Sequence, residues 1–376
     1  MNRSDAPRSP RRMTFLQALV DAPGRLSHWV SGRTHAMPRS PLKQPDFAAM
    51  VRASPRANGV LSLERDLRIF GDRQGAIAFA GSGRTAFACG GVHGPEKTNV
   101  LRAFTDSLAT SGYRRALLFP IGEDERNPCQ EGGFPSVRAG MEAFIKREDY
   151  TLRGKRYVDL RQMLNRATKR HNLQAWEVHL PVGKEALEAI HREWLLQRPT
   201  WTPMALVVGS PSLNLPLGRR YFAVGDAESK VPCAFISLAC GWNGAGWGVD
   251  VMARHPDAPA GAMELVISEA MTTLFDEEAA FFSLGAAPLF SGPSPSLRPT
   301  HPLERIMGWI YASRLANQFF NFNALARFKM KFDPSWVPVY IGLWPRPSIR
   351  ALYGGCRMWG LFGRAHLDPI EAEPLR

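Results

Sequence analysis

The sequence lacks the features that mark several large protein classes. Its five cysteines are odd in number and widely spaced, and they form no C-x-x-C pair, so neither a disulfide framework nor a zinc site is expected. No apolar run reaches the roughly 18 to 20 residues needed to cross a bilayer, and the N-terminus lacks the ordered regions of a signal peptide. These absences favour a cytoplasmic protein, either soluble or peripheral on the inner face of the cell membrane.

Short catalytic signatures are missing as well. The chain contains no G-x-S-x-G elbow, no P-loop, no H-E-x-x-H helix and no G-x-G-x-x-G turn, and its nine histidines are scattered without ligand spacing. The glycine-rich stretch "GSGRTAFACGG" lies in a predicted hairpin, where turn chemistry explains its glycines. We therefore expect neither a metal ion nor a bound cofactor.

Acidic residues are outnumbered. The 376 residues include 47 Lys or Arg against 34 Asp or Glu, a formal net charge of +13. Such a surplus favours nucleic acid, anionic lipid or phosphorylated small molecules as partners. The length predicts two domains. Residues 1–45 form a basic tail rich in proline and serine, which is either disordered or, through the apolar stripe in "MTFLQALV", peripheral on a membrane.

One structural unit occurs twice along the chain. "GAIAFAGSGRTAFACGG" predicts a hairpin, "VHGPEKTNVLRAFTDSLATSGY" a helix and "RRALLFPIG" a buried strand. The same order returns in "VPCAFISLACGWNGAGWGVDVMA", "GAMELVISEAMTTLFDEEA" and "AFFSLGAAPL". We expect an α+β protein with a first domain at 46–150, a second at 151–345 that opens with a basic linker helix, and a C-terminal helix and tail at 346–376. That last helix either packs on the domain or contacts a membrane.

Hairpin, helix and strand in this order form the central part of the GNAT acyltransferase fold. The loop that would meet a coenzyme A pyrophosphate is "RHPDAPAG" here, with two prolines, which donate no amide, and an aspartate. The architecture of an acyltransferase is therefore expected without coenzyme A as the donor.

The stretch "NALARFKMKFDPSW" at 323–336 combines cations with phenylalanines. Its alternation would suit a strand, but Leu325, Phe328 and Phe332 recur at helical spacing and Pro334 would end a helix. We expect a helix of about two and a half turns with these three residues as its apolar side. Arg327 and Lys331 would share a cationic side, and Lys329 would point elsewhere.

Four ordered stretches, "LRGKRYVDLRQMLNRA", "DVMARHPDAPAGAME", "FFSLGAAPL" and "FNFNALARFKMKFDPSWVPVY", resemble the C-terminal catalytic domain of the multiple peptide resistance factor family, the aminoacyl-phosphatidylglycerol synthases. The resemblance covers residues 59–345. It implies tandem GNAT-like folds, each a mixed and mostly antiparallel sheet flanked by helices, of which the second is catalytic. It also implies a stand-alone form without the family's membrane flippase.

The activity that the resemblance implies is transfer of an amino acid from aminoacyl-tRNA to a hydroxyl of phosphatidylglycerol or a related anionic lipid. A soluble small-molecule acceptor is one alternative. A non-catalytic module that binds tRNA or membrane is another.

The motif match assigns site residues as well. Lys329, Arg327 and Lys331 would contact phosphate or an oxyanion. Asp250 and Glu264 would bind the α-ammonium group of the amino acid or take the acceptor's proton, with Asp250 and Lys329 as the catalytic pair. The neighbouring wall would be lined by Arg161, Asn165 and Arg166. Each also has a structural interpretation: Asp250 as a loop cap, Glu264 as a partner of its helix dipole, and the arginines in surface ion pairs.

Overall fold

The computed structural model describes most of the chain from the end of the basic tail onward. The described residues are 37, 38, 40–64, 67–197, 213, 218–293, 298–361 and 367. The apolar stripe expected in the basic tail lies outside them. No helix among the described residues is long and apolar enough to cross a membrane.

The eleven strands of the described residues join in one mixed sheet with the order β1-β2-β3-β4-β11-β5-β10-β9-β8-β7-β6. Most neighbouring strands are antiparallel, and the parallel pairs are β3 with β4 and β9 with β10. The strands are β1 Arg68–Gly71, β2 Ala76–Ser82, β3 Thr85–His93, β4 Arg115–Ile121, β5 Ser136–Lys146, β6 Leu173–Val178, β7 Arg219–Asp226, β8 Pro232–Gly241, β9 Gly246–Arg254, β10 Phe281–Pro288 and β11 Ser335–Trp344.

The two predicted copies of hairpin, helix and strand are confirmed. The first consists of β2, β3, helix α3 (Lys97–Thr110) and β4, and the second of β8, β9, helix α8 (Ala262–Asp276) and β10. The second hairpin turns at Asn243-Gly244, as expected, and Asn243 has φ 55° there. The fold is the tandem GNAT-like α+β architecture expected from the sequence.

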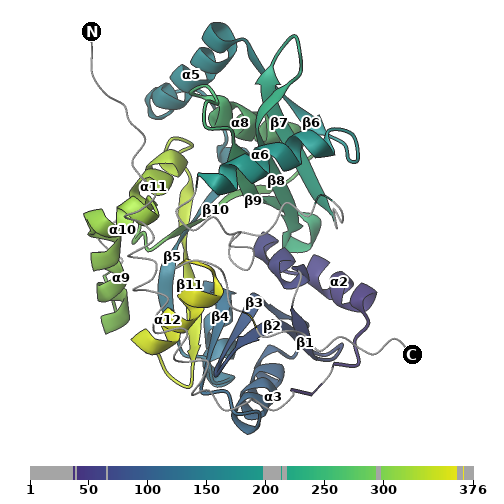
Figure 1. The fold of residues 1–376 in the computed structure, drawn as a ribbon, viewed down its shortest axis with the longest axis vertical. Coiled ribbons are helices and arrows are strands. Elements are labelled where there is room, and N and C mark those ends of the chain that lie inside the picture. The colour runs from purple at the N-terminus through teal and green to yellow at the C-terminus, as the bar shows by residue number, and fades with distance from the viewer. Residues whose placement is uncertain are drawn as a thin grey trace.

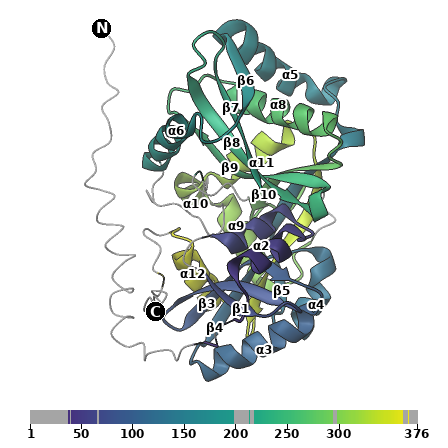
Figure 2. The ribbon, with the colours of Figure 1, turned by 90° about the vertical axis from the view of Figure 1, so that its right-hand side faces the viewer.

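The two copies exchange their last strands, which the sequence pattern does not predict. β5, from the first half of the chain, pairs with β10 of the second copy, while β11, from the end of the chain, pairs with β4 of the first. β5 and β11 also pair with each other at the centre of the sheet. The two copies follow one another along the chain, but in space they share one sheet (Figures 1 and 2).

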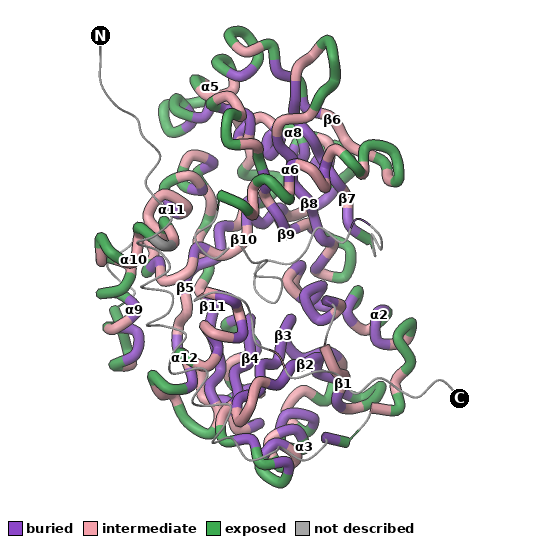
Figure 3. Tube along the Cα trace, in the orientation of Figure 1, coloured by how far each residue is buried: buried purple, intermediate pink, exposed green. Residues whose placement is uncertain are grey.

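Helices cover both faces of the sheet and follow the alternation of its strands. In β7, Phe222 and Val224 pack in the core beneath α8, whereas Tyr221 and Ala223 pack beneath α6. Buried residues accordingly line the sheet, and exposure is concentrated on the outer helices (Figure 3). The remaining helices among the described residues are α2 Gln44–Arg52, α4 Arg126–Glu131, α5 Val158–Asn165, α6 Lys184–Leu196, α9 Pro302–Ala312, α10 Arg314–Phe319, α11 Phe322–Met330 and α12 Ile349–Met358.

The two helices expected from amphipathic patterns outside the copies are both present. The linker helix is α5, which continues as a π-helical turn over Arg166–Arg170 and buries Leu160 and Ala167. The C-terminal helix is α12, which buries Ala351 and Met358 on the first copy. Its packing against the domain is thus established.

A 3-10 segment, η1 (Ala57–Leu63), bridges the two copies. It contacts β3 of the first copy and both β8 and β9 of the second. The contact leaves no room for a side chain at position 241 of the second copy, because a Cβ added to Gly241 would lie 2.3 Å from the backbone nitrogen of Ala57. Glycine at this position is therefore required for the bridge.

We predict that Gly241→Ala lowers the free energy of unfolding by about 1–3 kcal/mol, since backbone atoms must shift to admit the methyl group. Gly308→Ala, in helix α9, is the matched control because a Cβ there meets nothing within 4 Å. That control should leave stability unchanged or raise it by up to about 1 kcal/mol through helix propensity. Urea denaturation of both variants checks the prediction, and equal stabilities would contradict it.

Candidate active site

A gap between two parallel strands marks the candidate site. β9 and β10 pair only from Gly246 to Gly248 with Phe281 to Ser283. Beyond these residues β9 continues along β8 to Arg254, and β10 continues along β5 to Pro288. Past this point the backbone N–H and C=O groups on the facing edges of β9 and β10 do not pair with each other. They are therefore available to other hydrogen-bond partners.

Each of the two strands carries a bulge beside the gap. In β9, Val249 lies opposite Leu238 and Val251 opposite Ser237, so Asp250 is the extra residue. In β10 the register shifts between Ser283 and Ala286, where Gly285 has φ 78°. Bulges of this kind re-aim side chains and backbone groups and are common next to active sites.

Lys329 reaches the β10 bulge from helix α11. Lys329 is only 2% exposed, and its Nζ donates to the carbonyl oxygens of Gly285 at 2.8 Å and Ala286 at 2.7 Å. A Cβ added to Gly285 would lie 3.6 Å from this Nζ and 3.4 Å from the carbonyl oxygen of Val249. The amine therefore borders the gap between β9 and β10.

Burial changes the proton affinity of this amine. Desolvation lowers the pKa of Lys329 to about 7, and the nearby charge of Glu142 opposes the shift. Near neutral pH both protonation states are populated. The neutral amine can give its two N–H groups to the two carbonyls and keep its lone pair for a proton, whereas the protonated form has a third N–H to donate.

The side chain of Asp250 is buried on the β9 side of the gap. Its Oδ2 accepts from Arg219 Nε at 2.8 Å and from Ser237 Oγ at 3.3 Å. The Nη2 of Arg219 in turn lies 3.2 Å from Glu64, directly after η1. Burial raises the pKa of Asp250 to about 6, although the Arg219 charge acts in the opposite direction.

A second buried carboxylate, Glu142 of β5, has the same kind of surroundings. It accepts a hydrogen bond from Ser283 of β10, and its Oε2 lies 3.8 Å from Nη1 of Arg56, directly before η1. Each carboxylate thus has one serine from a neighbouring strand and one arginine. Arg56, directly before η1, lies beside Glu142, and Glu64, directly after η1, pairs with the arginine that holds Asp250.

Comparison with known proteins identifies the family. The sequence pattern described as "Phosphatidylglycerol lysyltransferase, C-terminal" matches residues 52–342. The chain belongs to this family. Solved structures agree in fold: a C-terminal domain described as a lysylphosphatidylglycerol synthetase from Agrobacterium fabrum has a TM-score of 0.68 at 22% identity, covering 82% of this chain and 93% of that one. L-PGS from Bacillus licheniformis has 0.68 at 19%, covering 86% and 98%.

Curated relatives of this family member are much longer proteins. The bifunctional lysylphosphatidylglycerol biosynthesis protein LysX of Mycolicibacterium vanbaalenii is 24% identical over 246 residues, which are 64% of this chain and 22% of LysX. The phosphatidylglycerol lysyltransferase of Bacillus subtilis is 24% identical over 245 residues, 64% of this chain and 28% of that protein. The chain spans about a quarter of their length.

Helix α11 has the predicted helical form, but its orientation differs from the prediction. The buried residues of the helix are Ala326 and Lys329, while Leu325 and Phe328 are only partly buried and Phe332 is buried just beyond its end. Lys329 lies apart from Arg327 and Lys331, as predicted, but it occupies the buried side of the helix, where the apolar pattern predicted Leu325 and Phe328. The bulge carbonyls of β10 accept hydrogen bonds from the Lys329 amine. The helix therefore buries Lys329 more deeply than its apolar neighbours Leu325 and Phe328.

The other predicted site residues of this family member lie on α5 and its π-helical continuation, in the first turn of α8, and on or directly after α11. Lys331 Nζ pairs with Glu264 at 2.7 Å, so the two predicted substrate-binding charges already neutralise each other. Arg161 Nη1 donates to the carbonyl oxygens of Leu152 and Gly154. The exposed ones are Asn165, Arg166 and Arg327. Only Asp250 and Lys329 flank the gap directly.

Sequence reasoning missed the groups that hold Asp250 and Glu142. A signal existed in the repeated pattern "AFISL" at 234–238 and "AFFSL" at 280–284, where one serine interrupts an apolar strand. A buried hydroxyl requires a partner, and Ser237 and Ser283 find theirs in the two carboxylates. Arg219 and Glu64 carried no such signal.

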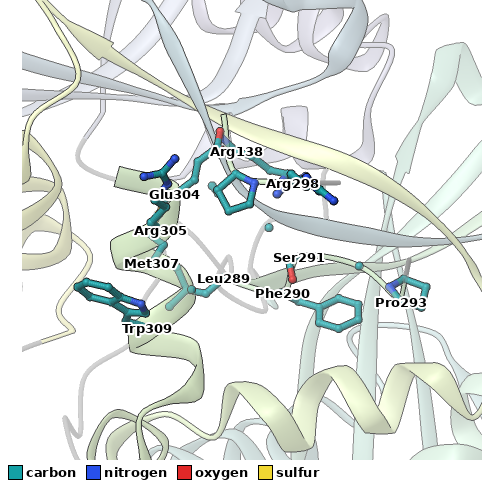
Figure 4. A pocket seen from close by; sticks show the side chains of 15 residues that line it. Arg138, Leu289, Phe290, Ser291, Pro293, Arg298, Glu304, Arg305, Met307 and Trp309 are labelled. Carbon is teal, nitrogen blue, oxygen red and sulfur yellow. The ribbon is translucent and has the colours of Figure 1, made fainter. Parts of the chain in front are cut away.

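A pocket of about 630 Å³ lies where β10 ends (Figure 4). Its walls come from β5, from the segment after β10 and from α9. Glu304 in its lining is held by the backbone N–H groups of Arg138 and Thr300, each at 2.9 Å. Its lining also includes Arg298, Arg305 and Trp309.

The lowered pKa of Lys329 predicts a specific dependence of stability on pH. Its ordinary pKa is 10.5 and its folded value is about 7, so between these values the unfolded chain binds more protons and stability rises with pH. In Lys329→Met this contribution is absent. Urea denaturation from about pH 7 to about pH 10 should show a rise of a few kcal/mol in wild type relative to the variant. Parallel curves for the two proteins would contradict the assignment.

Proposed function

We propose that the chain transfers an amino acid from aminoacyl-tRNA to a hydroxyl of phosphatidylglycerol or a related anionic lipid. Membership of the phosphatidylglycerol lysyltransferase family supports the lipid acceptor. The observation that carries the chemistry is the Lys329 amine, held by two carbonyls beside the gap with a pKa of about 7. A base with a pKa near the working pH is suited to proton transfer.

The reaction is an ester exchange. The acceptor hydroxyl oxygen forms a bond to the aminoacyl carbonyl carbon, and the bond from that carbon to the ribose oxygen breaks. One proton passes from the acceptor hydroxyl to the ribose oxygen, so no oxidant, reductant or net charge is involved. In this proposal neutral Lys329 takes the proton and the resulting ammonium returns it to the leaving oxygen. An aminoacyl ester is already activated, so alignment and proton transfer are the main tasks.

Asp250 is proposed to bind the α-ammonium group of the amino acid. Both of its described side-chain contacts are to Oδ2, which supports a role for Oδ1 as an acceptor. Arg219 and Ser237 fix the carboxylate in place. Outside the gap, the residues proposed to meet the phosphates of the tRNA 3′ end or of the acceptor are Arg161, Asn165, Arg166, Arg327 and Lys331. Glu264, which pairs with Lys331, is the second carboxylate proposed for the α-ammonium group.

Substitutions at Lys329 distinguish a base from a permanent cation. Transfer by wild type should increase as pH rises through about 7, because the amine must be neutral to act. Lys329→Arg retains a charge but cannot lose its proton, so it should fall about 100-fold or more, as should Lys329→Met. Release of label from aminoacyl-tRNA in the presence of phosphatidylglycerol vesicles measures the rate.

Arg73→Gln, on the exposed surface of the first copy, is the control for these variants and should match wild type. An active Lys329→Arg would show that the residue serves only as a cation. Label found in the aqueous phase with a soluble acceptor, and none in lipid, would replace the lipid with a small molecule. Absence of release from every aminoacyl-tRNA would refute the transferase proposal.

Removal of the Asp250 charge tests binding of the α-ammonium group. Wild type should prefer a donor with a free amino group over the N-acetylated aminoacyl-tRNA, and Asp250→Asn should lose about ten- to 100-fold of that preference. The ratio of kcat/KM for the two donors is the measurement. An unchanged ratio in the variant would assign Asp250 to proton transfer or structure instead.

A further inference from the structure

Helices α9 and α10 present an apolar surface that the proposed chemistry does not use. Trp309 is 75% exposed, Leu315 is 71% exposed and Ile310 is 41% exposed. On the other side of α9, Leu303 and Met307 are buried in the core. We call Trp309, Ile310 and Leu315 with their neighbouring arginines Arg298, Arg305 and Arg314 the α9–α10 face. Isolated exposed apolar residues are common, but three within seven positions on two consecutive helices form a patch.

The α9–α10 face is also strongly cationic. From residue 298 to residue 332 the chain contains one acidic residue, Glu304, which is buried and accepts two backbone N–H groups. Arg298, Arg305, Arg314 and Arg327 are exposed over the same stretch. Within the described part of the chain none of these four arginines forms an ion pair. A surface that joins exposed tryptophan and leucine to unpaired arginines matches an anionic bilayer, where aromatic rings lie at the headgroup level.

The pocket at the end of β10 opens on this same face. Its lining includes Arg298, Arg305 and Trp309, which also belong to the α9–α10 face, and Figure 4 shows these side chains around it. We infer that the α9–α10 face docks on an anionic lipid bilayer, with Trp309, Ile310 and Leu315 at the headgroup boundary and the arginines against lipid phosphates. The biological purpose of this docking rests on the proposed function, which it deepens. Docking itself requires no transfer of an amino acid.

Vesicle binding by the full chain tests the inference. Wild type should sediment with vesicles of equal parts phosphatidylglycerol and phosphatidylcholine and much less with phosphatidylcholine alone. The double variant Ile310→Ser with Leu315→Ser should bind the mixed vesicles about tenfold more weakly or worse. Arg314→Gln should weaken binding about fivefold at low salt, and the difference should shrink as salt rises.

The matched control is Val182→Ser with Val231→Ser. Val182 is 79% exposed and Val231 is 64% exposed, and both lie in loops of the second copy away from α9 and α10. This variant removes as much exposed apolar surface but should bind vesicles as wild type does. Wild-type binding by the Ile310 and Leu315 variant would overturn the inference. So would loss of labelled tRNA binding in that variant with vesicle binding intact, which would make the face an RNA surface.

Transfer assays separate this inference from the proposed function. With a water-soluble short-chain phosphatidylglycerol, the Ile310 and Leu315 variant should retain wild-type transfer, because neither residue lines the pocket or the gap. With long-chain vesicles its transfer should fall in parallel with its binding. If wild type transfers nothing to any acceptor, the proposed function fails, while the vesicle result still decides whether the face docks on lipid.

Discussion

The pairing of β5 with β11 at the centre of the sheet is the constraint on which the rest of the structure depends. Ser335, the first residue of β11, lies opposite Phe144 of β5, and Phe144 lies opposite Ser283 of β10. The end of α11, just before β11, is therefore held two strands away from the β10 bulge. Ion pairs from Lys331 to Glu264 and from Asp333 to Arg156 fix the same end. Lys329 reaches the bulge because the strand that follows its helix has been exchanged into the first copy.

Burying charge beside the gap has an energetic cost that the structure offsets locally. A carboxylate in the interior is costly unless hydrogen bonds and an opposite charge compensate it. Asp250 has Ser237 and Arg219, and Glu142 has Ser283 and Arg56. Lys329 donates to two carbonyl oxygens. The carboxylate whose charge acts on it, Glu142, already interacts with Ser283 and Arg56, so burial still lowers the pKa of Lys329. A lysine that paired fully with Glu142 would remain charged and could not act as a base near neutral pH.

The sequence predicts what is local and misses what is distant. The repeated unit, the linker helix and α11 follow from apolar periodicity and turn residues, and Asp250 and Lys329 follow from motif resemblance. The exchange of β5 and β11 could not be predicted, because any apolar strand can pair with several neighbours and register depends on the whole sheet. Arg219 and Glu64 lie 155 residues apart in the chain and meet only through the position of η1. The burial of Lys329 depends on a bulge in another strand, which helical periodicity does not reveal.

The first copy has a corresponding gap, and its contents explain why the two copies differ. β3 and β4 pair from Thr85 to Cys89 and then part, as β9 and β10 do. Here η1 enters the gap: Ser62 Oγ donates to the Cys89 carbonyl at 2.7 Å, and a Cβ on Gly90 would lie 2.2 Å from that Oγ. The Cys89 carbonyl beside this gap is thus satisfied by the chain itself. Arg56 and Glu64 flank η1 directly, and they lie beside Glu142 and Arg219. The segment that fills the gap of the first copy therefore also positions charged side chains beside the gap of the second.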